Sequence, residues 1–141
     1  MDSVNAPILS LILEGIRSLH APELIKLFNE SIPLSKTLIA CLDSLNEQDQ
    51  LMACCACLLA WYMTGGKQVP RQAQLESCLA TFNGKDSLVY AGTGSGKTLP
   101  IALNILLEDL EKQLIAITIS PLKQLQITQV CTLSPRLLFS I

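Results

Sequence analysis

The sequence predicts an α/β fold in which a small all-helical region precedes a partial parallel sheet. Apolar residues recur at helical spacing through residues 1–66. Two short apolar runs, residues 87–90 and 114–119, are typical of buried strands. A helical pattern separates these runs, and the order strand, helix, strand indicates parallel strands joined by a right-handed crossover.

Length and charge limit the number of domains and the classes of function to consider. The chain has 141 residues, which suits one ordinary domain or a small domain with part of another. Half of the residues are hydrophobic, so a sizeable core is expected, and the formal net charge of −2 gives no overall sign of a nucleic-acid-binding protein. Three basic and seven acidic residues give residues 1–66 a charge of −4, whereas seven basic and five acidic residues give residues 67–141 a charge of +2.

The cysteines indicate burial rather than metal binding. Cys54, Cys55 and Cys57 lie in an apolar helical run, and the single histidine, His20, is too distant in sequence to complete a usual zinc set. We therefore expect buried small residues on a helix. No secretory signal pattern precedes them, so we expect a reducing intracellular compartment. The apolar run 51–63 is too short to span a bilayer, and no membrane partner is expected.

Four helices are expected in the first region, where Ser35 is the predicted cap of the third helix and Asn46 that of the fourth. A linker at Gly65–Lys67 divides the chain into residues 1–66 and residues 67–141. The expected helices of the first region cover residues 7–19, 21–29, 35–45 and 46–64.

The second region is expected to alternate helices and strands. Pro70 falls near the start of its first helix, and Asn83-Gly84 ends that helix. The expected elements are a helix to about residue 82, a strand at 87–90, a helix at 99–110, a strand at 114–119 and a helix from 120 to about 131.

The stretch Ala91–Thr98 lies between the first strand and the next helix and fits the Walker A phosphate-loop pattern. Its glycines allow successive backbone N–H groups to point at a phosphate, and the start of the following helix adds a favourable dipole. The alternative is a glycine-rich turn that binds nothing. Such a turn would not require Gly-Lys-Thr at the start of a helix, so these residues favour the phosphate loop. The predicted ATP ligands here are Gly92, Thr93, Gly94, Ser95, Gly96, Lys97 and Thr98. Lys97 is the catalytic candidate on the β- and γ-phosphates, and the Thr98 hydroxyl is the candidate Mg²⁺ ligand.

Three segments together resemble superfamily 2 helicases of the DEAD/DEAH kind, most closely the RecQ-like branch. They are Pro70–Gln74, Gly92–Thr98 and Ser120–Val130, and the resemblance covers residues 69–131, about half of the chain. It implies that residues 67–141 form part of a RecA-like ATP-binding domain. It also implies ATP, Mg²⁺ and nucleic acid as ligands.

The resemblance assigns adenine recognition to Gln74, which lies 23 residues before Lys97. A glutamine amide is a suitable bidentate partner for the adenine edge. Arg71 would support the base or a phosphate. The alternative is an ordinary exposed helix glutamine. The family usually stacks an aromatic residue on the adenine; Trp61 and Tyr62 are candidates, but core packing is the favoured interpretation of both.

The third segment resembles the motif that touches the sugar–phosphate backbone of a bound strand. By that resemblance Ser120, Pro121 and Lys123 would contact nucleic acid, DNA rather than RNA. The alternative is a strand end followed by a solvated lysine. Because RecQ-like enzymes act on DNA, the resemblance makes a nuclear location plausible in a eukaryotic host.

The acidic residues that the family uses for ATP hydrolysis are missing. The family takes its Mg²⁺ carboxylate and water-orienting group from a D-E-x-[DH] motif further along the chain, but the last acidic residue here is Glu111. A second RecA-like domain is absent too. We therefore expect the N-terminal part of a helicase, or a truncated relative, that binds nucleotide without hydrolysing ATP or unwinding DNA.

Two other functions stay open at this point. One is a non-catalytic interaction module in which residues 1–66 bind a protein partner and the phosphate loop is a relic. The other is an unrelated P-loop enzyme such as a nucleotide kinase. The position of Gln74 argues against the kinase, which would also need more arginines than Arg71 and Arg136.

Overall fold

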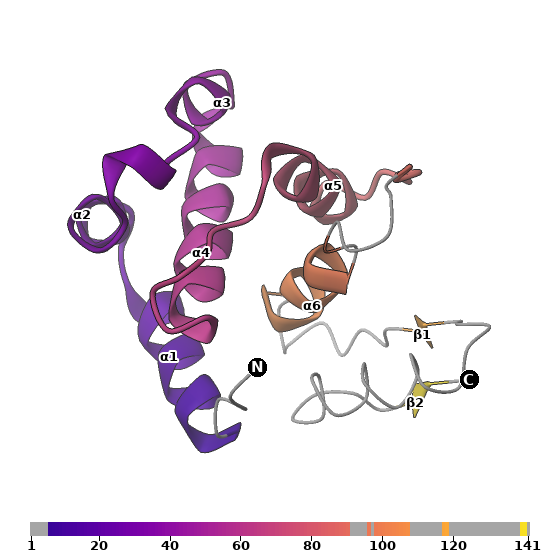
Figure 1. Ribbon diagram of the computed structural model, residues 1–141, viewed down its shortest axis with the longest axis horizontal. Helices are drawn as coiled ribbons and strands as arrows, with labels where there is room; N and C mark the ends of the chain where they lie inside the picture. Colours follow the sequence, from indigo (N-terminus) through magenta and orange to yellow (C-terminus); the bar gives the residue numbers. More distant parts are fainter. Residues whose placement is uncertain (1–5, 91–95, 97, 108–116, 119–138, 141) are drawn as a thin grey trace.

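The computed structural model describes residues 6–90, 96, 98–107, 117–118 and 139–140, and most of these residues are helical (Figure 1). Two very short strands, β1 (Ile117–Thr118) and β2 (Phe139–Ser140), pair in parallel. The helices are α1 (Ala6–Ser18), α2 (Ala21–Ser31), the 3₁₀ helix η1 (Leu34–Lys36), α3 (Ile39–Asp43), α4 (Glu47–Met63), α5 (Gln72–Phe82) and α6 (Thr98–Leu107). None of the described helices is long and apolar enough to cross a membrane.

Helix α4 is the centre of the described structure. It contacts all five other α-helices, with α1 and α2 on one side, α5 and α6 on the other, and α3 at the end where α4 begins (Figure 1). Its second half is apolar almost all the way round, which is typical of a helix enclosed by neighbours. The buried residues of α4 are Ala53, Cys54, Ala56, Cys57, Leu58, Leu59 and Ala60. Alanine and cysteine at these positions allow neighbouring helices to approach closely.

One hydrophobic cluster joins the helices on both sides of α4. It includes Leu24 and Phe28 of α2, Leu75 of α5 and Leu103 of α6. Arg17 of α1 adds a polar link, because its Nη2 donates to the carbonyl oxygen of Leu106 at 2.9 Å. The core of the helical region therefore continues into the helix that follows the glycine-rich loop.

The cap of α4 confirms one sequence prediction. The Oδ1 atom of Asn46 accepts a hydrogen bond from the Asp49 N–H at 2.9 Å, as expected of an N-cap. The Asp49 carboxylate accepts in turn from Asn46 Nδ2 and from Asn83 Nδ2, both at 3.0 Å. Because Asn83 is the C-cap of α5, this group of three residues ties the start of α4 to the end of α5.

The predicted cap at Ser35 is wrong. Ser35 lies inside η1, and α3 begins only at Ile39. The Thr37 hydroxyl donates to the carbonyl oxygen of Leu34 at 2.8 Å, and the Thr37 backbone is extended at the end of η1. The chain therefore completes one short turn and starts α3 after it, rather than continuing as one helix from residue 35.

The predicted α/β fold class, with its partial RecA-like parallel sheet, is also wrong. Residues 87–90 are not a strand: Leu88 is 94% exposed and Tyr90 101% exposed, and neither makes a backbone hydrogen bond to another described residue. Among the described residues, the β1–β2 pair of two residues each is the only strand pairing. Helices supply the core instead, because each helix closes its own backbone hydrogen bonds whereas a strand requires a neighbour. Residues 108–110, 114–116 and 119–131, where the sequence predicts further helix and strand, lie outside the described residues.

Candidate functional site

The first turn of α5 positions Gln74. Arg71 is the N-cap of this helix, with φ −72° and ψ 161°, and the fully buried Pro70 precedes it. The Oε1 atom of Gln74 accepts a hydrogen bond from the Arg71 N–H at 2.7 Å. This is the side-chain-to-N-cap half of a capping box, in which the third residue of the helix reaches back to the cap. Helix formation at α5 therefore fixes where the Gln74 amide lies.

The other end of the same amide contacts the glycine-rich loop. Gln74 Nε2 donates to the carbonyl oxygen of Gly96 at 2.8 Å. These two residues are 22 positions apart, so the contact is a tertiary one. The structure therefore brings together the two segments that the sequence analysis assigns to adenine and to phosphate.

Gly96 is a position that only glycine fits. Its φ is +75°, in the left-handed region that other residues rarely adopt, and a Cβ there would lie 2.5 Å from Gln74 Nε2. The Gly96 carbonyl also accepts from the Leu99 N–H at 3.2 Å. Gly96 thus connects Gln74 to the first turn of α6, which begins at Thr98.

Arg71 contributes its backbone to this arrangement. Its side chain is exposed, and the contact with Gln74 is made by the backbone N–H. Gly92, Thr93, Gly94, Ser95 and Lys97 lie outside the described residues, as does the side chain of Thr98. The predicted nucleic-acid contacts Ser120, Pro121 and Lys123 lie outside them too. Of the predicted site, Arg71, Gln74 and Gly96 are the residues that the structure places together.

The two candidate adenine-stacking residues are engaged within the helical region. The Trp61 ring has the Lys36 ammonium 5.3 Å from its centroid, and a Cβ added to Gly66 would lie 3.5 Å from the ring. The Tyr62 hydroxyl is 3.3 Å from the Ser31 hydroxyl. Trp61 is partly buried against the hydrophobic cluster, as the core-packing interpretation predicts, whereas Tyr62 is exposed and lies outside that cluster.

Cys54 and Cys57 of α4 are buried, as the sequence indicates, and so is Cys78 of α5, whereas Cys55 is half-buried. Burial raises the pKa of the Cys54 thiol to about 11 and the pKa values of the Cys57 and Cys78 thiols to about 12. The Cys78 thiol donates to Asn104 Oδ1 at 3.3 Å and so links α5 to α6. Within the described part of the chain, no three acidic, histidine or cysteine residues gather as a metal site. These thiols are packing groups and not nucleophiles.

Lys36 makes contacts that the sequence does not predict. Its Nζ donates to the carbonyl oxygen of Lys67 at 2.6 Å, besides lying over Trp61. No spacing pattern could have found this contact, because its partners are 25 and 31 residues further along the chain. It joins η1 to the segment that leads into α5.

Comparison with known proteins relates this site to a family. Residues 71–139 match the family model of the DEAD/DEAH box helicases. The match starts at the N-cap of α5 and includes Gln74, the glycine-rich loop and α6. No curated protein matches the chain, and no solved structure does. The matched part is therefore related to the helicase superfamily, whose members use ATP with Mg²⁺ and bind nucleic acid.

Proposed function

We propose that this chain binds Mg·ATP between the start of α5 and the glycine-rich loop, as the nucleotide-binding part of a RecQ-like DEAD/DEAH helicase. The observation that carries the proposal is the hydrogen bond from Gln74 Nε2 to the Gly96 carbonyl. It holds the candidate adenine reader against the candidate phosphate loop, and a nucleotide needs both groups within the reach of one molecule.

The chemistry of the Gln74 side chain suits adenine. Its contacts with the Arg71 N–H and the Gly96 carbonyl hold the amide in one orientation. A glutamine amide can both donate and accept hydrogen bonds, which matches the N6 donor and N7 acceptor of adenine. Guanine presents an oxygen in place of the N6 amino group, so the same amide orientation favours ATP over GTP.

The phosphate end of the proposal uses residues 92–98. Helix α6 begins at Thr98, so its first N–H groups and its positive dipole end lie at the loop. In the proposal Lys97 contacts the β- and γ-phosphates, and Thr98 ligates the Mg²⁺ ion. Ser120, Pro121 and Lys123 would contact the backbone of a nucleic acid strand, with DNA preferred to RNA.

Turnover is not part of the proposal for this chain alone. No Asp or Glu follows Glu111 within these 141 residues, so the proposal is limited to the binding of Mg·ATP. We propose residues 1–66 as a helical region and residues 67–141 as the nucleotide-binding part. The described core joins the two.

Calorimetric titration of the purified chain with Mg·ATP and Mg·GTP tests this function. We expect Lys97→Ala to abolish binding. We expect Gln74→Ala to reduce the preference for ATP on the order of tenfold, because one bidentate base contact is lost. Gln72→Ala is the matched control: Gln72 is an exposed glutamine on the same helix, and its Nε2 contacts Glu76 Oε1 at 2.9 Å. A folded chain that binds neither nucleotide would contradict the proposal and favour a protein-interaction module.

A further inference from the structure

We propose that Lys36 is a positioning residue for the adenine-reading segment, although it belongs to the helical region. The inference rests on the proposed ATP site. One ammonium group makes two contacts across the fold: Lys36 Nζ donates to the Lys67 carbonyl oxygen at 2.6 Å and lies 5.3 Å from the centroid of the Trp61 ring. An ammonium has three donors and is attracted to an aromatic face, so both contacts can form at once. Lys36 thereby holds η1, the end of α4 and the α4–α5 connection together.

The connection that Lys36 holds has a defined backbone. Gly66 N–H donates to the Trp61 carbonyl at 2.8 Å and Gly65 N–H to the Tyr62 carbonyl at 3.2 Å. The φ angle is 62° at Gly65 and 76° at Gly66, and together with these two bonds it defines a Schellman motif at the end of α4. The Trp61 carbonyl therefore accepts the closing backbone bond, and the ring of the same residue lies beneath the Lys36 ammonium.

A hydroxyl group fixes the next residues. Thr64 Oγ1 donates to the Ala60 carbonyl at 2.8 Å and accepts from the Gln68 N–H at 3.0 Å. Thr64 thus bonds the start of segment 64–68 to α4, and Gln68 bonds the end of the segment back to Thr64. The Lys67 carbonyl that Lys36 holds lies within this segment.

The segment leads directly to the site. Pro70 is fully buried, and Arg71 follows it as the N-cap whose N–H binds Gln74. Gln74 then holds Gly96. Lys36 is thus linked to the amide proposed to read adenine in three steps: its bond to Lys67, the backbone of residues 68–70, and the bond between Arg71 and Gln74. Loss of the ammonium releases the Lys67 carbonyl four residues before the N-cap and loosens the position of that amide.

The test compares Lys36→Met with Lys36→Arg and with Lys26→Met. Methionine keeps an apolar stem but removes the ammonium, whereas arginine restores a cation over the ring. Lys26 is the matched control, because its exposed ammonium contacts only Glu30, at 3.9 Å, among the ion pairs of the described residues. Binding of Mg·ATP and Mg·GTP is measured by calorimetry, and folding is monitored by circular dichroism.

We expect Lys36→Met to weaken ATP binding about fivefold and to reduce the ATP-over-GTP preference by a similar factor, the scale of one hydrogen bond. Lys36→Arg should restore the preference, and Lys26→Met should leave it unchanged. Gly66→Ala disturbs the same segment from its other side, through a strained φ of +76°, and should also reduce the preference.

Two results would overturn the positioning role. The first is a folded Lys36→Met chain with unchanged ATP affinity and preference. The second is an equal loss of ATP and GTP binding, which points to general destabilisation. If the unmodified chain is folded and binds neither nucleotide, the proposed function itself fails, and that result is distinct from both.

Discussion

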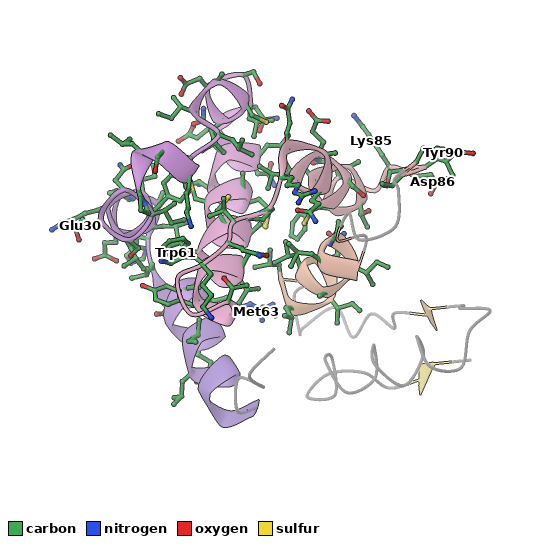
Figure 2. The ribbon with its side chains drawn as sticks, in the orientation of Figure 1. Glu30, Trp61, Met63, Lys85, Asp86 and Tyr90 are labelled. Atoms are coloured by element: carbon green, nitrogen blue, oxygen red, sulfur yellow. The ribbon has the colours of Figure 1, made fainter. Side chains whose placement is uncertain are left out.

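Helix α4 and the segment 87–90 are both apolar in sequence, yet the structure buries α4 and exposes the segment. Leu58 and Leu59 of α4 are fully buried, whereas Leu88 and Tyr90 are almost fully exposed. Figure 2 shows Tyr90 at the outer end of its segment, pointing away from the helices. A helix closes its backbone hydrogen bonds within its own sequence and needs only side-chain packing, whereas a strand also needs a neighbouring strand. Apolar character is therefore sufficient for burial of α4, whereas segment 87–90 would also need a partner strand.

Truncating a leucine should have a large effect in α4 and a small one in segment 87–90. Leu59→Ala should lower the free energy of unfolding by about 3 kcal/mol, because it leaves a cavity in the central cluster. Leu88→Ala should change it by less than about 0.5 kcal/mol, since an exposed side chain loses little on truncation. Urea denaturation followed by circular dichroism measures both. Equal losses would show that residue 88 is buried in solution.

The same comparison explains how much of the fold could be predicted from the sequence. Helices α1, α2, α4 and α5 lie close to their predicted positions because their spacing, prolines and caps are local signals. The Asn46 cap and the end of α5 at Asn83-Gly84 are examples. The contact between Asp49 and Asn83 could not be predicted, because it depends on how two helices cross.

The candidate site divides in the same way. The spacing of Gln74 and the glycine-rich loop is a sequence signal, and the structure places Gln74 against Gly96. The contact of Lys36 with Lys67 has no such signal. The strand prediction for residues 87–90 failed because apolar residues raise strand propensity without supplying a partner.

A pH titration tests the buried side of the comparison. Burial raises the pKa of Cys57 from its ordinary value of 9.0 to about 12, with smaller contributions from neighbouring thiols. Above pH 9 the unfolded chain loses this proton and the folded chain keeps it, so the stabilisation is complete below pH 9 and is lost between pH 9 and about pH 12. At pH 10 we expect a loss of about 1 kcal/mol from this thiol.

Urea unfolding of the native chain and of Cys57→Ala, at pH 8 and at pH 10, measures that loss. The informative quantity is the difference between the two chains in how steeply the free energy of unfolding changes with pH, because the groups that both chains share cancel in that difference. The free energy of unfolding of Cys57→Ala should change less between pH 8 and pH 10 than that of the native chain. Identical slopes would mean that Cys57 is accessible to solvent in the folded chain.

Removing the cap of α4 should have a smaller effect than truncating its core. Asn46→Ala removes the acceptor for the Asp49 N–H, so we expect a loss of about 1 kcal/mol. Asn46→Ser keeps a capping oxygen and should recover most of it. Thermal unfolding at a single pH measures both variants. If alanine and serine destabilise equally, the cap contact contributes nothing and α4 is held by its packing alone.

The smallest expected effect is the sharpest test of the exposed segment. Val89→Pro removes a backbone N–H that makes no hydrogen bond to another described residue, so we expect a change below about 0.5 kcal/mol in the free energy of unfolding. Ala53→Pro is the contrasting variant, because it breaks the buried ladder of α4 and should cost about 3 kcal/mol or more. A proline inside a paired strand also removes a ladder hydrogen bond. A large loss for Val89→Pro would therefore show that residues 87–90 pair with a strand in solution, and the contrast between the two regions would not hold.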